Sequence, residues 1–430
     1  MNIAIIGSGP SAFYTIQSLL REGIKVQIDV FEKHPAPFGL VRYGVAPDHQ
    51  KTKNITRLFA KYLSEENVNF YGNINIGKDI DISILSAIYD VVIISTGSAD
   101  DRVLNIEGSK LIGVYGSSEF VGWYNGNSEH EYLKPNLAIN NAVIIGNGNV
   151  ALDCARVLAK TYDEFYGSDI TEYSLIELEK SKVENIFVIG RRTPRDSKFT
   201  IAELRELGNL NNYTPTVNCK SNTLEDILKD TEIDTKVKKN IELLLSFKNL
   251  NNIKKNKIVF DFLLTPYKIN GKEKVESITF KKSKILNNKL ELTNETETIK
   301  TNLVISAIGY KVNAIKGIDL DPTKSFYANK NGHIKNNIYT NGWASGASVG
   351  VIGSNKIGAA LLVKKILEEI KSCKNSPRED LISFFKDNNI NYIDKSSWNK
   401  INDIEQSQAD KNFTRKKLVN IKDIFKKLSI

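Results

Sequence analysis

The sequence predicts an α/β fold with two Rossmann-like domains, because apolar strand-like runs alternate with helical stretches and one beginning occurs twice. Residues 3–12 read IAIIGSGPSA and residues 142–151 read AVIIGNGNVA. Each stretch has a short apolar strand, a glycine turn and the first residues of a helix. The second copy therefore predicts a second domain of the same kind within one chain.

Length and composition fit this interpretation. A chain of 430 residues is long for one core, so two domains are expected. The chain is 41% hydrophobic and its apolar runs are far shorter than the roughly 20 residues of a membrane helix. No signal or transit segment is visible before the first strand, so we expect a cytoplasmic protein. Three separated cysteines without a C-x-x-C pair, and four histidines, argue against a metal or dithiol centre.

The net charge of +9 comes mainly from lysines spread along the chain. Two interpretations stay open: a solvated lysine-rich surface, or a basic face that binds an acidic partner. Nucleic acid is the less favoured partner, because no basic motif with interleaved aromatic residues is present.

The elements follow in order along the chain. The first strand and turn lead into a helix over 13–23, and the next strand covers 26–33. Further strands are expected at 90–98, 141–149, 185–192, 257–266, 276–280 and 302–310. The Lys- and Asn-rich region 250–300 predicts an antiparallel excursion, and the helix at the end of 341–370 would complete the first domain. We place the first domain at 1–104 and 321–430, and the second domain at 105–320.

The first glycine turn predicts a dinucleotide site. Gly7 permits the tight turn, Gly9 lets the backbone approach a pyrophosphate, and the small Ala12 lets the helix pack on the sheet. The next strand ends in Glu32, an acid that can accept both hydroxyls of an adenosine ribose. This acid allows FAD or NAD. A glycine turn also occurs in α/β proteins without this function, but the strand, helix and acid favour a nucleotide.

The second turn, at Gly146 and Gly148, is followed by a strand that ends in Arg191 and Arg192. Two guanidinium groups can bind a 2′-phosphate in fork geometry and stack on adenine. The alternative is a pair of surface arginines after a strand. Because Rossmann folds discriminate the cofactor at this position, the sequence favours an NADP site.

Residues 34–54, HPAPFGLVRYGVAPDHQKTKN, form the most distinctive stretch. Three prolines and two glycines predict a long structured loop without regular helix or strand. Gly39 and Gly44 would let the backbone pass close to a flat ring, and Asp48 and His49 would supply a proton-handling group. A loop used only for packing is the alternative.

Several segments together resemble the ferredoxin–NADP reductases of the adrenodoxin reductase type. They are GSGPSAFYT, FEKHPAPFGLVRYGVAPDH, FYGNINIG, FVGWYNG, VIIGNGNVALDCARVL, VIGRRTPRDSKFTIAELREL, SAIGY and NGWASGASVGVIGSNK. Their order and spacing match the family across nearly the whole chain. The resemblance implies a glutathione-reductase-like flavoprotein of two dinucleotide-binding domains. Its NADP domain would be inserted into a discontinuous FAD domain made from both chain ends.

The resemblance also assigns residues. It places FAD contacts at Ser11, Glu32, Leu40, Ile76, Trp343, Gly350, Val351 and Ile352, beside Gly7, Gly9, Ala12 and Gly39. It places NADP contacts at Asn147, Gly148, Asn149, Val150, Arg191, Arg192, Glu203 and Gly350. His49 and Asp153 match polar residues near the flavin, and Arg205, Lys236, Lys238 and Lys239 match a basic docking face. The family usually has Arg-Gly-Pro where this chain has Gly346, Ala347 and Ser348, which weakens the assignment of Gly350.

The expected activity is hydride transfer from NADPH to FAD, followed by single-electron transfer to an acidic ferredoxin-type iron–sulfur protein. One alternative is an NADPH-dependent flavin subunit like that of glutamate synthase, or a diaphorase. Such subunits usually carry N-terminal cysteine clusters, which this sequence lacks. The alternative without enzyme activity is a nucleotide-sensing module. Such a module needs only one glycine turn, so the presence of two turns and of the loop 34–54 speaks against it.

Overall fold

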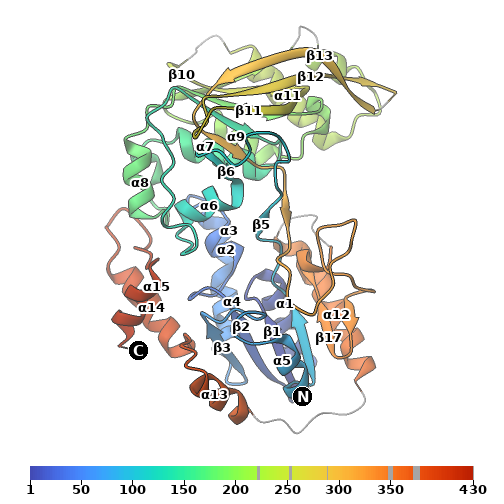
Figure 1. Ribbon diagram of the computed structural model, residues 1–430, viewed down its shortest axis with the longest axis vertical. Helices are drawn as coiled ribbons and strands as arrows, with labels where there is room; N and C mark the ends of the chain where they lie inside the picture. Colours follow the sequence, from blue (N-terminus) through green and yellow to red (C-terminus); the bar gives the residue numbers. More distant parts are fainter. Residues whose placement is uncertain (220–222, 251–253, 288, 347–351, 371–377, 430) are drawn as a thin grey trace.

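The computed structural model describes residues 1–430 except 220–222, 251–253, 288, 347–351, 371–377 and 430, and it shows two lobes (Figure 1). The lobe that holds both chain ends lies at the bottom of this view. The middle of the chain forms the upper lobe. Each lobe is built around its own sheet of six strands.

The first sheet has the strand order β16-β17-β4-β1-β2-β3. Its strands are β1 (Asn2–Ile6), β2 (Gln27–Glu32), β3 (Val68–Gly72), β4 (Val91–Ile94), β16 (His333–Lys335) and β17 (Ile338–Thr340). All pairs are parallel except β16 with β17. Because β17 pairs with β4, residues far along the chain complete the N-terminal sheet, as the expected discontinuous domain requires.

Alternating residues of β1 are buried on opposite faces of this sheet, as the strand period of two dictates. Ile3 and Ile5 pack into the core shared by α1 (Pro10–Arg21), α4 (Ile55–Ser64) and α12 (Asn355–Glu369). Ala4 and Ile6 pack into the core that includes residues of α5 (Ile82–Ile88) and α13 (Arg378–Asp387). Helix α1 is buried over most of its surface, because α12 and α4 both lie against it.

The second sheet is wholly parallel and has the order β6-β14-β7-β8-β10-β9. Its strands are β6 (Val114–Gly116), β7 (Asn141–Ile145), β8 (Asn185–Gly190), β9 (Tyr213–Asn218), β10 (Asn256–Phe262) and β14 (Val304–Ser306). One face packs on α6 (Ser117–Asn125), α7 (Asn149–Ala159), α9 (Ile201–Leu207) and α11 (Thr235–Lys248). The other face packs on an antiparallel sheet of β11 (Leu264–Asn270), β12 (Ser277–Leu286) and β13 (Lys289–Lys300).

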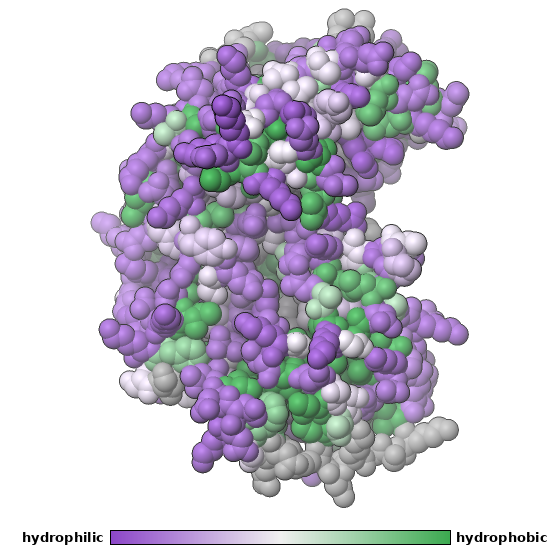
Figure 2. Space-filling view, viewed as in Figure 1, coloured by the Kyte–Doolittle hydropathy of each residue, from purple (hydrophilic) through white to green (hydrophobic). Residues whose placement is uncertain are grey.

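Two short antiparallel strands join the lobes, β5 (Asp100–Asp101) and β15 (Tyr310–Lys311). The outline of the molecule is indented between the lobes on the right side of the view (Figure 2). The Asp101 carboxylate accepts hydrogen bonds of 2.9 and 3.0 Å from the Ser118 N–H at the start of α6. This contact fixes the linker against the upper lobe.

The structure corrects two details of the sequence prediction. The strand expected over 257–266 is two strands, because Leu263 has a φ of 60° and turns the chain from β10 into β11. The loop 34–54 contains two short helices of four residues each, α2 (Leu40–Tyr43) between its two glycines and α3 (Gln50–Lys53) after its last proline. The antiparallel excursion expected within 250–300 is confirmed as β11–β13. The domain boundaries at 104/105 and 320/321 stay predictions.

In the part of the chain that the structure describes, none of the helices combines the length and hydrophobicity that a bilayer crossing requires. The cytoplasmic location stays a prediction.

Candidate functional site

The first glycine turn leaves open space at the N-terminus of α1. Gly7 has a φ of 99°, and its N–H donates to the Phe31 carbonyl at 2.7 Å, which joins the turn to β2. Gly9 is the N-cap of α1, and a Cβ added there would meet nothing within 4 Å. A helix N-terminus with free N–H groups and open space in front of it suits a phosphate. Ala12 is fully buried where the helix packs on the sheet.

The loop 34–54 lies directly against this turn. The Phe38 N–H donates to the Ser8 carbonyl at 3.0 Å. Gly39 has a φ of 50°, and a Cβ on it would lie 2.9 Å from the Gly9 Cα, so only glycine fits without a shift. Leu40, the first residue of α2, is half-buried beside it.

Glu32 is fixed beside the same turn at the end of β2. Its carboxylate accepts from the Ser8 N–H at 3.0 Å, from the Ser8 hydroxyl at 2.6 Å and from the His34 N–H at 3.1 Å. Only 6% of the residue is exposed. The acid predicted to accept ribose hydroxyls is therefore held at the first glycine turn.

Residues from the C-terminal part of the chain contact α1 next to this turn. The Asn341 amide donates to the Thr15 hydroxyl at 2.6 Å, and the Ser11 hydroxyl donates to the Asn355 side chain at 3.1 Å. Between these anchors, Trp343 stacks on Tyr310 with ring centroids 6.5 Å apart. Positions more than 300 residues apart thus meet at α1.

The other predicted FAD contacts have different surroundings. Ile76 is buried in the core under the first sheet, with Ile80 and Ile315. Ile352 is partly buried against the core around α1 and α12. Gly350 and Val351 lie outside the described residues, as do Ala347 and Ser348 of the altered segment.

The second glycine turn has the same design. Gly146 has a φ of 137°, and its N–H donates to the Ile189 carbonyl at 2.9 Å. Gly148 is the N-cap of α7 and also faces open space. The Asn149 side chain accepts from the Thr200 N–H at 2.8 Å, and Val150 packs partly on the core. The side-chain oxygen of Asn147 is buried without a hydrogen-bond partner among the described residues, so it is an acceptor available to a ligand.

Arg191 and Arg192 follow β8 directly and are both exposed. Arg192 Nη1 lies 3.6 Å from Asp196 Oδ1, with 48% of the side chain exposed, so this ion pair is weak. Because Gly146 is hydrogen-bonded to Ile189, both arginines lie at the strand end next to the second turn. Their charges are available for a phosphate.

A cluster of ion pairs lies where the loop 34–54 meets the upper lobe, and it brings together three predicted residues. The Arg156 guanidinium on α7 contacts Asp153 Oδ1 at 2.8 Å and Glu203 Oε2 at 3.1 Å. Its Nε and Nη2 donate to the Asp48 carboxylate at 3.0 and 3.1 Å. His49 Nε2 lies 3.7 Å from Glu203 Oε2, so His49, Asp153 and Glu203, separate in the sequence, share one site.

Burial and charge shift the pKa values in this cluster, which lies between α7, α9 and the loop 34–54. Burial by itself would lower the pKa of His49, but the hydrogen bond to Glu206 at 2.8 Å raises it. Burial and nearby Asp153 raise the pKa of Glu203 to about 7. Burial also raises the pKa of Asp153, against the effect of Arg156. Near neutral pH this cluster can hold a proton.

Sequence reasoning missed Arg156 and Glu206 as members of this cluster. Each stands three positions after a predicted residue, Asp153 or Glu203, and so lies on the same helix face. That spacing was the available signal. It is too common among the charged residues of helices to single out a site.

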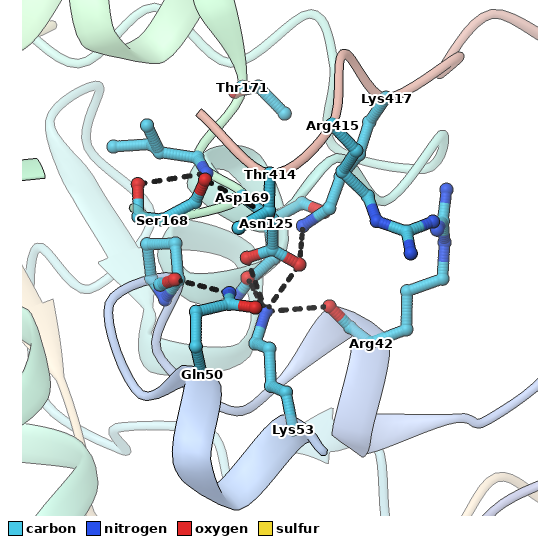
Figure 3. Close-up of polar contacts among 12 residues, drawn as sticks. Arg42, Gln50, Lys53, Asn125, Ser168, Asp169, Thr171, Thr414, Arg415 and Lys417 are labelled. Carbon is cyan, nitrogen blue, oxygen red and sulfur yellow. Dashed lines mark hydrogen bonds and ion pairs between the residues drawn. The ribbon is translucent and has the colours of Figure 1, made fainter. Parts of the chain in front are cut away.

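A second buried network fixes the loop 34–54 to the upper lobe (Figure 3). Lys53 Nζ donates to Asp169 Oδ1 at 2.7 Å and to Asn125 Oδ1 at 3.0 Å. Lys417 Nζ lies 3.1 Å from the other oxygen of Asp169. Asp169 therefore joins the upper lobe to α3 and to Lys417, near the end of the chain.

The basic residues expected to meet an acidic partner are all exposed. Arg205 lies on α9, and Lys236, Lys238 and Lys239 lie on α11, which packs next to α9. None of these four takes part in an ion pair within the described residues.

Comparisons with known proteins agree with this geometry. Residues 1–184 match the family model of the pyridine nucleotide-disulphide oxidoreductases. The chain is 35% identical to the NADPH-ferredoxin reductase FprA of Mycobacterium tuberculosis, over 86% of this chain and 84% of the relative. It is 36% identical to the probable mitochondrial NADPH:adrenodoxin oxidoreductase of Schizosaccharomyces pombe, over 86% of this chain and 83% of the relative.

A solved structure agrees at the level of the fold. The structure of M. tuberculosis FprA in complex with NADPH matches with a TM-score of 0.93 and 32% identity, over 99% of this chain and 98% of that one.

Proposed function

Because the chain belongs to the family of NADPH-ferredoxin and NADPH:adrenodoxin oxidoreductases, we propose that its two glycine turns hold FAD and NADPH respectively. The protein is an FAD-dependent oxidoreductase that passes electrons from NADPH to a ferredoxin-type iron–sulfur protein. One observation carries the assignment of the turns. Both helix N-termini face open space, but one neighbouring strand ends in an acid and the other is followed directly by two arginines.

The residues of the first turn would hold FAD. The N-terminus of α1 suits its pyrophosphate, and the Glu32 carboxylate suits its ribose hydroxyls. Gly39 lets the loop approach, and Ser11 and Trp343 close the site from α1 and the C-terminal segment. When bound, FAD supplies two-electron acceptance from NADPH and one-electron release to a metal centre.

The residues of the second turn would hold NADPH. The N-terminus of α7 suits the pyrophosphate, Asn147 offers its unpaired oxygen, and Arg191 and Arg192 suit the 2′-phosphate. His49 and Asp153 lie in the ion-pair cluster between the loop 34–54, α7 and α9, and the pKa of each is raised. Their proposed role is to orient polar groups and hold a proton near the two cofactors. The protein contributes position more than acid–base catalysis.

We further propose that the acidic iron–sulfur partner docks on Arg205, Lys236, Lys238 and Lys239. Complementary charge would speed its association, so turnover should fall as salt is added. Ferredoxin reduction that does not depend on salt would remove the case for this face.

Purified protein tests the function directly. It should be yellow, its flavin absorbance should bleach when NADPH is added without oxygen, and the bleached protein should reduce a ferredoxin. A colourless protein that takes up no FAD would overturn the assignment. Bleaching without reduction of any ferredoxin tested would instead favour the flavin-subunit alternative.

A further inference from the structure

Arg156 is the most deeply buried charge of the cluster between the lobes. Its side chain is 1% exposed, and four carboxylates surround it, those of Asp48, Asp153, Glu203 and Glu206. A buried cation is costly unless it is paired and hydrogen-bonded, and here every direction of the guanidinium is used. Such a group is held rigidly, and it can hold its neighbours in turn.

The guanidinium contacts two residues that hold His49, one next to it in the chain and one hydrogen-bonded to its ring. On the backbone side it binds Asp48, the residue directly before His49, through Nε and Nη2. On the ring side, Nη1 lies 3.2 Å from Glu206 Oε2, the same oxygen that lies 2.8 Å from His49 Nε2. The histidine is therefore fixed from two sides by one residue of the opposite lobe.

We propose that Arg156 is a positioning residue for hydride transfer, which holds the His49 imidazole in place between the two cofactor turns. This inference rests on the proposed function, because it takes the region between the turns as the place of reaction. Arg156 acts through Asp48 and Glu206, without itself touching a cofactor.

The charges around His49 give this arrangement a measurable consequence. Arg156 and Asp153 face it from α7, Glu203 and Glu206 face it from α9, and Asp48 is next to it in its own loop. Glu206 raises the pKa of His49, whereas Arg156 lowers it. Loss of Arg156 should therefore raise the pKa of His49, and loss of the Glu206 charge should lower it.

Histidine titration by NMR tests this in the FAD-loaded protein, since the chain has only four histidines and a His49→Gln variant assigns the signal. We expect Arg156→Gln to raise the pKa of His49 by about one unit, and Glu206→Gln to lower it by a similar amount. The matched control is Lys160→Met. Lys160 also contacts Asp48, at 2.6 Å, but it makes no ion pair with Glu203 or Glu206 in the described part of the chain. The pKa of His49 should hardly change in this control.

Arg156→Lys separates position from charge. It keeps the cation near His49 but cannot bridge Asp48 and Glu206 with a planar fork. We expect a nearly normal His49 pKa, normal FAD content and thermal midpoint, and flavin reduction by NADPH about tenfold slower, which is about 1.4 kcal/mol in the barrier.

The outcomes are distinct. An unchanged His49 pKa in Arg156→Gln, or unchanged flavin reduction in Arg156→Lys, overturns the inference even if the wild type reacts with NADPH. If Arg156→Gln does not fold, the rate of flavin reduction by NADPH in Arg156→Lys still decides the outcome. Failure of the wild type to bleach with NADPH would refute the proposed function, whatever the titration shows.

Discussion

Lys53 and Asp169 form a buried ion pair between the two lobes, with 2.7 Å from Lys53 Nζ to Asp169 Oδ1 (Figure 3). Lys417, near the end of the chain, forms an ion pair with the same carboxylate, with 3.1 Å from Lys417 Nζ to Asp169 Oδ2. Two buried lysines thus share one acid. Burial lowers the pKa of each lysine, while together they lower the pKa of Asp169 to about 2 against the effect of burial.

Replacement of Asp169 by Asn should destabilise the protein by about 3–5 kcal/mol, because it leaves two buried ammonium groups without a counter-charge. The midpoint of denaturant unfolding measures this loss. Asp226→Asn is the matched control, since Asp226 pairs with Lys229 on the surface, with 61% of its side chain exposed. Its cost should stay below about 1 kcal/mol. Equal stability of the two variants would contradict this role of Asp169.

The stability of the protein should fall in acid through the same residue. Asp169 has a lowered pKa in the folded state, about 2, so its contribution is complete above the unfolded pKa of about 4 and is lost as pH falls through the folded value. Asp48, whose pKa Arg156 lowers against the effect of burial, acts in the same direction. We expect an unfolding free energy that falls between about pH 4 and pH 2. In Asp169→Asn this slope should be shallower.

Replacement of Arg191 and Arg192 by Ala should weaken NADPH use and leave NADH use nearly unchanged. Loss of charge-assisted hydrogen bonds worth about 1.5–3 kcal/mol lowers kcat/KM for NADPH by roughly 10- to 100-fold. Steady-state kinetics with both nucleotides measure the change. Arg195→Ala is the control, because Arg195 is equally exposed nearby but pairs with Asp230 at 2.6 Å. A wild type that prefers NADH would refute the 2′-phosphate assignment.

Gly39→Ala should abolish or greatly reduce FAD retention, because the added Cβ meets the Gly9 backbone at 2.9 Å and pushes the loop off the turn. Gly23→Ala is the matched control for Gly39→Ala. Gly23 also has a positive φ, 67°, but a Cβ there meets nothing within 4 Å. This control should cost only about 1 kcal/mol of backbone strain and keep its FAD. The ratio of flavin to protein absorbance after gel filtration measures both.

Reversal of charge at Lys236, Lys238 and Lys239 should raise KM for an acidic ferredoxin and reduce its salt dependence, while flavin reduction by NADPH stays normal. The control reverses Lys422, Lys426 and Lys427, which are exposed on α15 (Ile421–Leu428) in the other lobe. It makes the same change in net charge far from α11 (Figure 1). If both triple variants behave alike, the effect comes from net charge and no local docking face exists.

The geometry of the two glycine turns could be predicted from the sequence because each turn is local. Gly7, Gly9 and Glu32 lie within one strand–turn–helix–strand unit, and the backbone of that unit fixes where they point. The same holds for Gly148 and Arg191, whose strand end is set by the pairing of β7 with β8. The composition of the loop 34–54 predicts a structured loop but cannot predict its two short helices, since four residues are too few for a helical period.

The tertiary structure decided the contacts between the lobes. His49 and Glu206 are 157 positions apart, and Lys53 and Asp169 are 116 apart. The chain has 59 basic and 50 acidic residues, so composition and spacing leave many possible partners for each. The docking of the two sheets selects among them, because only buried charges must find a counter-charge, and burial is set by how the lobes pack. The sequence by itself determined which cofactor chemistry each turn presents, and the fold determined which side chains meet between the turns.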